Sequence, residues 1–364
     1  MRPAWLFGAR LDVSVFLGSF ALSMIALAAG AWTGMLDDDT PSWLWVPAVI
    51  LCDVAHVWAT AFRTYLDPGE RRARRRLFTV VPVVGLAASI ALYALGTMTF
   101  WRTLAYLAIF HFVRQQYGWV SLYRARNGER DRLGKVIDTA AIYASTLYPL
   151  LYWHTHVPRR FSWFVTGDVV ALPPFLLPAG FALWALALAA YVVRAIVLWS
   201  RGTPNPGKDL VVATTAVAWY LGIVAFDSDY AFTVTNVFMH GIPYFALVFV
   251  QGRRKDAAPA GAPSWTSRVA SNVFAYLGVL WVVAFVEELL WDRAVWHDRA
   301  WLFGEAWSLT GWELVIVPLL ALPQLTHYVL DGFIWKRRSN QALAALASAP
   351  SSAGLDVDPR GAEA

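Results

Sequence analysis

The chain has 364 residues, of which 58% are apolar and only 15% are charged, and its mean hydropathy is +0.47. Soluble domains carry roughly 25% charged residues, so this composition excludes an ordinary soluble protein and indicates an integral membrane protein. The net charge of +5 does not indicate a nucleic-acid partner, because the basic residues fill short gaps between apolar runs. The single cysteine, Cys52, excludes a disulfide framework and a zinc site built on thiolates.

Ten apolar stretches approach the ~20 residues with which a helix crosses a bilayer core. They lie at about 12–34, 42–65, 77–98, 100–123, 135–157, 172–198, 209–226, 230–251, 269–290 and 311–335. The sequence therefore predicts an all-α fold, a polytopic transmembrane bundle of about ten spans that forms a single domain over residues 1–338. The tail 339–364 is rich in Ala, Ser and Gly, and we predict that it is disordered.

The basic residues predict the orientation of this bundle. The gaps after even-numbered spans are strongly basic, as in 70–76 (ERRARRR) and 251–255 (QGRRK), whereas the other gaps carry few cations. Cytoplasmic loops have the excess of Lys and Arg in membrane proteins. We therefore expect both termini, and the tail, in the cytoplasm, and the protein as a multi-pass component of the cytoplasmic (inner) membrane.

Four of the predicted spans carry polar residues at helical spacing. Residues three or four positions apart lie on the same side of a helix. The four polar faces are Asp53 with His56; His111 with Arg114 and Gln115; Asn236 with His240 and Tyr244; and Gln324 with His327 and Asp331. Polar and ionisable residues inside a membrane are costly and usually face the interior of the bundle. We therefore expect these four faces to meet in one buried site.

Histidine is the commonest metal ligand, and its neutral imidazole can enter an apolar site without an ionised charge. The predicted metal ligands are His56, His111, His240 and His327, with Asp53 and Asp331 as further ligands or as partners that orient the imidazoles. Asn236 and Gln324 are expected to support this set. The alternative is that these histidines only join helices, because polar side chains link membrane helices at roughly 0.6 kcal/mol each.

Arg114, Gln115 and Tyr117 follow His111 towards the basic, cytoplasmic end of the same span. Arginine pairs well with phosphate or carboxylate. We therefore expect Arg114 and Gln115 to position a lipid or isoprenoid substrate whose chain reaches the metal. Tyr117 or Tyr244 is expected to donate a proton in the reaction.

Intramembrane histidines with carboxylates on the same helices resemble the integral-membrane histidine-motif lipid oxygenases, the desaturase and hydroxylase class. The resemblance covers four short stretches around the histidines, and the chain lacks the H-x-x-x-H and H-x-x-H-H clusters of those di-iron enzymes. It implies oxidative modification of a lipid, with an electron donor as a partner. Four to six candidate ligands suit one ion better than two. Nitrogen and oxygen ligands with open positions suit iron and dioxygen, so for this oxidative chemistry we expect iron rather than zinc or copper.

Other functions fit the same residues. A proton-coupled transporter would use the intramembrane histidines and aspartates as a proton relay. A b-type haem protein would bind haem between two opposed histidines. Zinc-assisted hydrolysis is a further alternative. Sequence alone leaves the metal, the substrate and the reaction type open.

Overall fold

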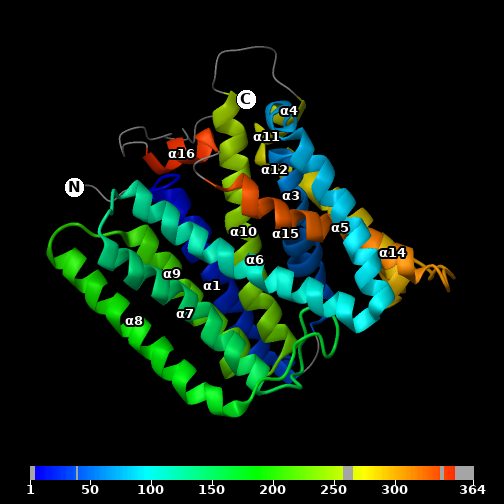
Figure 1. Ribbon diagram of the computed structural model, residues 1–364, viewed down its shortest axis with the longest axis horizontal. Coiled ribbons are helices and arrows are strands. Elements are labelled where there is room, and N and C mark those ends of the chain that lie inside the picture. Colours follow the sequence, from blue (N-terminus) through cyan, green and yellow to red (C-terminus); the bar gives the residue numbers. More distant parts are fainter. Residues whose placement is uncertain (1–4, 38–39, 257–264, 337–339, 349–364) are drawn as a thin grey trace.

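The computed structural model describes residues 5–37, 40–256, 265–336 and 340–348 (Figure 1). Within these ranges the chain forms helices and connecting loops and no strand, so the predicted all-α class is confirmed. The long helices coincide with the predicted apolar stretches. They are α1 (Ala9–Thr33), α5 (Arg75–Leu95), α6 (Thr97–Arg126), α7 (Arg132–Thr155), α8 (Leu177–Ser200), α9 (Pro206–Trp219), α10 (Asp229–Asp256) and α12 (Val273–Trp291).

Two further predicted spans are built from shorter pieces. One joins α2 (Ser42–Trp45), the π-helix η2 (Val46–Val54) and α3 (Ala55–Arg63). The other joins α14 (Glu313–Leu320) and α15 (Leu322–Ile334) with a bend of 42°. The remaining short elements are η1 (Met35–Asp37), α4 (Pro68–Ala73), η3 (Pro174–Leu176), η4 (Tyr220–Ala225), α11 (Trp265–Ala270), η5 (Asp292–Trp296), α13 (Ala300–Phe303) and α16 (Gln341–Ser348).

The described residues contain seven helical stretches long and apolar enough to cross a membrane, or eight if the bent pair α14–α15 is one span. This is fewer than the ten predicted. The difference lies in α6 and α7, which are long enough but carry more polar residues. Many of those polar residues are buried in the protein, for example His111 and Gln116 on α6 and Asp138 on α7. A helix that is covered by its neighbours does not need an apolar surface of its own.

The outer helices expose apolar side chains in continuous belts. Tyr191 is the one buried residue of α8, and Phe181, Leu186 and Val193 on the same helix are all exposed. Large exposed apolar surfaces are rare on soluble monomers. These belts therefore indicate a membrane protein whose outer helices face lipid.

Two of the apolar cores flank α10, which runs through the middle of the bundle beside α1 (Figure 1). One core is formed by α1, α6, α7 and α9, with Trp119 and Tyr123 among its buried residues. The other is formed by η2, α3, α10 and α12, with Tyr244 and Tyr276. The predicted polar faces lie where these two halves meet, because α3 packs against α10 and α15, and α15 packs against α6.

A buried ionic network joins α6, α7 and α9 through the loop at Glu129. The Lys208 ammonium lies 2.7 Å from a Glu129 oxygen and 2.9 Å from Asp138 Oδ2, and Arg124 pairs with both carboxylates. Burial would raise the pKa of Glu129, but Lys208, the Asn205 amide and Arg124 together bring that pKa below its ordinary value. The network therefore holds the C-terminal end of α6 against the N-terminal ends of α7 and α9.

The tail differs from the prediction in its first part. Helix α16 lies within the segment predicted to be disordered, and its Leu343, Leu346 and Ala347 are buried in the same core as Trp119. These three residues have helical spacing, so one apolar face can pack on the bundle although the composition is low in complexity. The prediction is therefore wrong for Gln341–Ser348, while 349–364 lie outside the described residues.

Candidate metal centre

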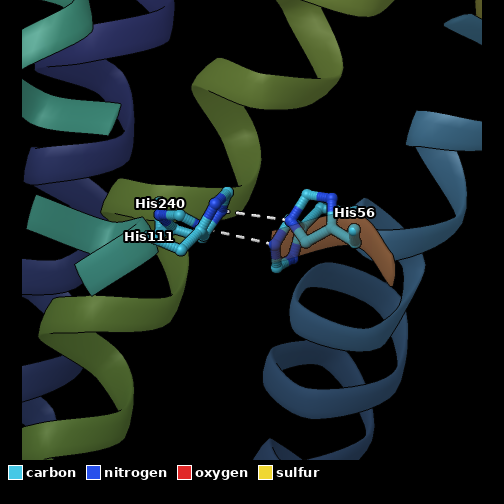
Figure 2. A group of neighbouring side chains, drawn as sticks. His56, His111 and His240 are labelled. Carbon is cyan, nitrogen blue, oxygen red and sulfur yellow. Dashed lines mark hydrogen bonds between the residues drawn. The ribbon is translucent and has the colours of Figure 1, made fainter. Parts of the chain in front are cut away.

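Four histidines from four helices converge inside the bundle. They are His56 on α3, His111 on α6, His240 on α10 and His327 on α15, and each is at most 4% exposed. One ring nitrogen from each lies within 4.8 Å of the other three. Figure 2 shows His111 and His240 on one side of this group and His56 on the other, with the ring contacts dashed. The sequence predicted that the four polar faces meet in one buried site, and the imidazoles of these faces do lie together.

The ring nitrogens are spaced as metal ligands are. The Nε2–Nε2 distances are 3.1 Å from His56 to His240, 3.2 Å from His240 to His111, and 3.1 Å from His111 to His327. Metal–nitrogen bonds of about 2.0–2.1 Å in a tetrahedral site put neighbouring ligand nitrogens about 3.3 Å apart. Pairwise hydrogen bonding explains the group less well, because a neutral imidazole has either one N–H or one lone pair at Nε2. Two of these nitrogens each face two others. The buried four-histidine group can therefore bind a metal ion.

A polar network holds the Nδ1 atom of His327, the ring nitrogen that does not face the other histidines. The Oγ1 atom of Thr60 lies 2.6 Å from His327 Nδ1 and 2.6 Å from the Tyr244 hydroxyl, which donates a hydrogen bond of 2.8 Å to Asp331 Oδ1. Asp331 also lies 3.7 Å from Nδ1 of His327 and 3.9 Å from Nδ1 of His111. Both distances are longer than a hydrogen bond, so the Asp331 carboxylate supports the His327 imidazole through the Tyr244 and Thr60 hydroxyls. Of the two roles predicted for Asp331, the geometry favours orientation over direct ligation.

The other two imidazoles have different supports. Asp53 lies 3.6 Å from Nδ1 of His56, and its side chain is 38% exposed although the imidazole beside it is buried. The ring of Phe112 stacks on that of His240 at 3.5 Å with an interplanar angle of 5°. Gln115 donates a hydrogen bond of 2.9 Å to the backbone carbonyl of His240. Both contacts fix the orientation of His240, so Gln115 positions a predicted ligand as well as lining the nearby cavity.

Small residues allow the helices to come this close. A Cβ atom on Gly241 would lie 2.7 Å from Cys52 Sγ and 3.0 Å from the Cys52 carbonyl oxygen. Gly241 therefore permits direct contact between α10 and η2, the segment that leads into His56. The π-helical conformation of η2 ends immediately before α3. Such wider turns are rare and are often found at functional sites, because they shift the direction of the following side chains.

Two predicted supporting residues lie elsewhere. Asn236 is buried but donates to the backbone carbonyl of Phe232 on its own helix, at 3.0 Å. Gln324 is partly buried and makes no side-chain hydrogen bond within the part of the chain that the structure describes. Neither is hydrogen-bonded to one of the four histidines. Thr60 and Asp331 provide the hydrogen-bonding support that was expected from Asn236 and Gln324.

The residues predicted to bind substrate line a large cavity beside the centre. The cavity has a volume of about 810 Å³, and its walls include His111, Tyr244, Tyr328, Asp331, Arg114 and Tyr117. Arg114 donates to the hydroxyl of Tyr143 on α7, and its guanidinium lies 4.8 Å from the centre of the Tyr117 ring. Tyr244 is the predicted proton donor that lies within the hydrogen-bond network of the histidines.

Sequence reasoning missed several residues around the histidines. Thr60 lies four positions after His56 and could have been found from the helical period, whereas nothing in the sequence marked Phe112. Glu287 and Glu288 on α12 lie outside the four predicted polar faces, and both are buried. Trp58 on α3 donates to Glu287 at 2.5 Å, since α12 packs against α3 and covers these carboxylates.

Comparisons of the chain with protein families, with curated proteins and with solved structures found no match. The geometry of the centre and of the cavity beside it is therefore the basis for the function proposed for this protein.

Proposed function

We propose that the protein is a metal-dependent membrane enzyme that binds one metal ion through His56, His111, His240 and His327. The observation that carries this proposal is the convergence of four buried ring nitrogens within 4.8 Å of one another. Histidines that only joined helices would need one partner each, and four separate helices would not have to point their imidazoles at a common centre. The second ring nitrogen of His327 is held by the Thr60 hydroxyl, which is connected through Tyr244 to Asp331, and supports of this kind are usual for metal-binding histidines.

The proposed reaction is oxidative modification of a lipid or isoprenoid, with iron favoured over zinc or copper. Imidazole suits all three metals, so the preference for iron follows from the proposed chemistry and not from the ligands. Hydroxylation of this kind consumes dioxygen, two electrons and two protons and releases water, so an electron donor is a further expected partner. The metal would supply the redox centre, and the cavity against His111 would bring the substrate to it.

The polypeptide would contribute positioning and a proton. The Tyr244 hydroxyl lines the cavity and donates to Asp331 Oδ1, so it can transfer a proton at the edge of the centre. Tyr117 is the weaker candidate because its ring lies under the Arg114 guanidinium and stacks with Tyr143. Arg114 and Gln115 are proposed to bind substrate, and Gln115 also fixes the His240 backbone.

We further propose that all ten predicted spans cross the cytoplasmic membrane and that both termini are cytoplasmic. The length of α6 and α7 supports this count, since both are long enough to cross a bilayer and bury their polar residues among other helices. The orientation is supported by the basic gaps after the even-numbered spans.

Elemental analysis of purified protein tests the metal centre. We expect about one equivalent of iron per chain, and loss of most of it in His111→Ala and His327→Ala. His156→Ala is the matched control, because His156 is exposed and lies outside the group. Equal metal loss in the control, or metal-free wild-type protein that is folded, would contradict the proposal.

The same purified protein also distinguishes the two alternative functions, a b-type haem protein and a proton-coupled transporter. The geometry disfavours a b-type haem, because four ring nitrogens occupy the space in which the macrocycle would have to lie between two opposed histidines. A reduced-minus-oxidised absorbance spectrum without haem bands would agree with this. Folded, metal-free protein with pH-dependent ion flux would favour the proton-coupled transporter.

A further inference from the structure

We infer that the cavity beside the histidines is the binding site of a long-chain fatty acid, which enters sideways from the bilayer and pairs its carboxylate with Arg114. This names the substrate class of the proposed enzyme and in that sense rests on the proposed function. The binding itself needs no metal, so it can be tested separately.

The cavity has the length and lining that an acyl chain requires. It follows α6 from Tyr106 to Leu122, seventeen residues that rise about 24 Å along the helix axis. A lipid chain spans about half of the ~30 Å hydrocarbon core of a bilayer. The walls are mostly apolar and aromatic, and the volume of about 810 Å³ is in the range of ligand-binding cavities. A single extended chain therefore fits along α6.

The cavity opens towards lipid. Phe110 on α6 and Leu147 on α7 both line it, and they are 61% and 50% exposed on the outer surface of the bundle. Two glycines leave open space along the cavity wall. Gly118 and Gly332 also line the cavity, and a Cβ on either would have no heavy atom within 4 Å. A glycine inside a helix costs about 1 kcal/mol of stability relative to alanine. Close packing against another helix does not explain these two glycines, because no atom lies where their Cβ would be.

Arg114 supplies a charge that a carboxylate would match. Within the described residues no carboxylate lies in ion-pair distance of its guanidinium, which contacts the Tyr143 hydroxyl and the Tyr117 ring. An Arg at the centre of a membrane helix costs about 2.5–3.5 kcal/mol on insertion scales. A guanidinium can bind the two oxygens of one carboxylate side by side. An anionic ligand would therefore offset this cost, and its chain would continue along the apolar walls.

The position of Arg114 also predicts which part of the chain faces the histidines. Arg114 follows His111 by three residues, about 4.5 Å along the helix. The segment of substrate beside His111 would therefore lie near the carboxyl end of the chain and not near its methyl end.

Binding of radiolabelled palmitate to chelator-treated, full-length protein in phosphatidylcholine nanodiscs tests the inference. We expect one saturable site per chain, with at least tenfold weaker affinity in Arg114→Gln and a smaller loss in Arg114→Lys. Hexadecanol, which has the same chain without the charge, should bind at least tenfold more weakly than palmitate. Arg76→Gln removes an exposed arginine that does not line the cavity, and this variant should bind palmitate as the wild type does.

A second pair of variants tests the cavity without touching Arg114. Gly118→Leu combined with Gly332→Leu should fill the space and abolish palmitate binding. Gly18→Leu is the control, because Gly18 on α1 also has no neighbour within 4 Å but does not line the cavity. Unchanged palmitate affinity in the filled variant, or in Arg114→Gln, would overturn the inference.

Two further outcomes complete the test. Equal binding of hexadecanol would refute the role of the charge, and tighter binding of 1-palmitoyl lysophosphatidate would refute the carboxylate in favour of a phosphate head. Failure of the proposed metal centre and failure of the fatty-acid site give different results. Protein that binds palmitate through Arg114 but no metal would refute the metal centre alone, and protein with metal but no palmitate site would refute the inference alone.

Discussion

Replacing Gly241 with alanine should damage the metal centre although Gly241 binds nothing itself. The added Cβ would lie 2.7 Å from Cys52 Sγ and 3.0 Å from the Cys52 carbonyl oxygen. Non-bonded atoms are most stable at about 3.5–4.0 Å, so α10 and η2 would have to separate by about 1 Å. His240 and His56 would move apart with them, and metal–ligand distances tolerate only about 0.2 Å. We expect metal affinity to fall at least tenfold.

The free energy of unfolding of Gly241→Ala is an independent test of the same close contact. Alanine is a better helix former than glycine by about 1 kcal/mol, whereas forced overpacking costs about 1–3 kcal/mol. The net change should therefore be destabilising or near zero. Zinc competition against a chromogenic chelator and thermal unfolding in detergent measure the two effects. In Gly278→Ala, where the Cβ meets no atom within 4 Å, metal affinity should be unchanged. Gly241→Ala protein that is more stable than the wild type and binds zinc as tightly would refute the reasoning.

Three other perturbations have defined outcomes. Tyr244→Phe removes the hydroxyl between Thr60 and Asp331, and loss of such supporting hydrogen bonds should lower metal affinity about 10–100-fold in the same competition assay. Removal of metal by a chelator should lower the melting temperature, since an ion at 100 times its Kd stabilises by about 2.7 kcal/mol; an unchanged melt would indicate that the histidines bind none. The pKa of Glu129 is lower in the folded protein than its ordinary value of 4.5. The ion pairs of Glu129 should therefore stabilise the protein fully above pH 4.5. This stabilisation should disappear as the pH falls through the lower pKa of the folded state. Melting curves of wild type and Glu129→Gln should therefore differ at neutral pH and converge in acid, and a constant difference would contradict this account.

The sequence predicted the helices and the histidines well because both signals are local. Apolar runs of about 20 residues predict helices wherever they occur in the chain. The spacing of His327 and Asp331, or of His111 and Gln115, predicts a shared helical face without knowledge of any neighbour. The described structure has helices at all ten predicted ranges, and its metal-competent group consists of the four predicted histidines.

Contacts between helices were not predictable in the same way. Nothing in the sequence indicates that Phe112 stacks on His240, or that Gln115 reaches the His240 carbonyl. The burial of Glu287 also depends on which helix covers it, as does the helical state of Gln341–Ser348. Composition alone marks such segments as polar or of low complexity, because it does not include the surface against which they pack.

Taken by itself, the chain determined that it is a helical membrane protein with one imidazole on each of four helices, because hydropathy and the 3.6-residue period are properties of short stretches. Only the tertiary structure decided that the four ring nitrogens share one centre, that Asp331 lies near the Nδ1 atoms of His327 and His111, and that a cavity along α6 reaches that centre. These features depend on interhelical distances of a few ångströms, which are set by the packing of residues such as Gly241 and Cys52 that lie far apart in the chain.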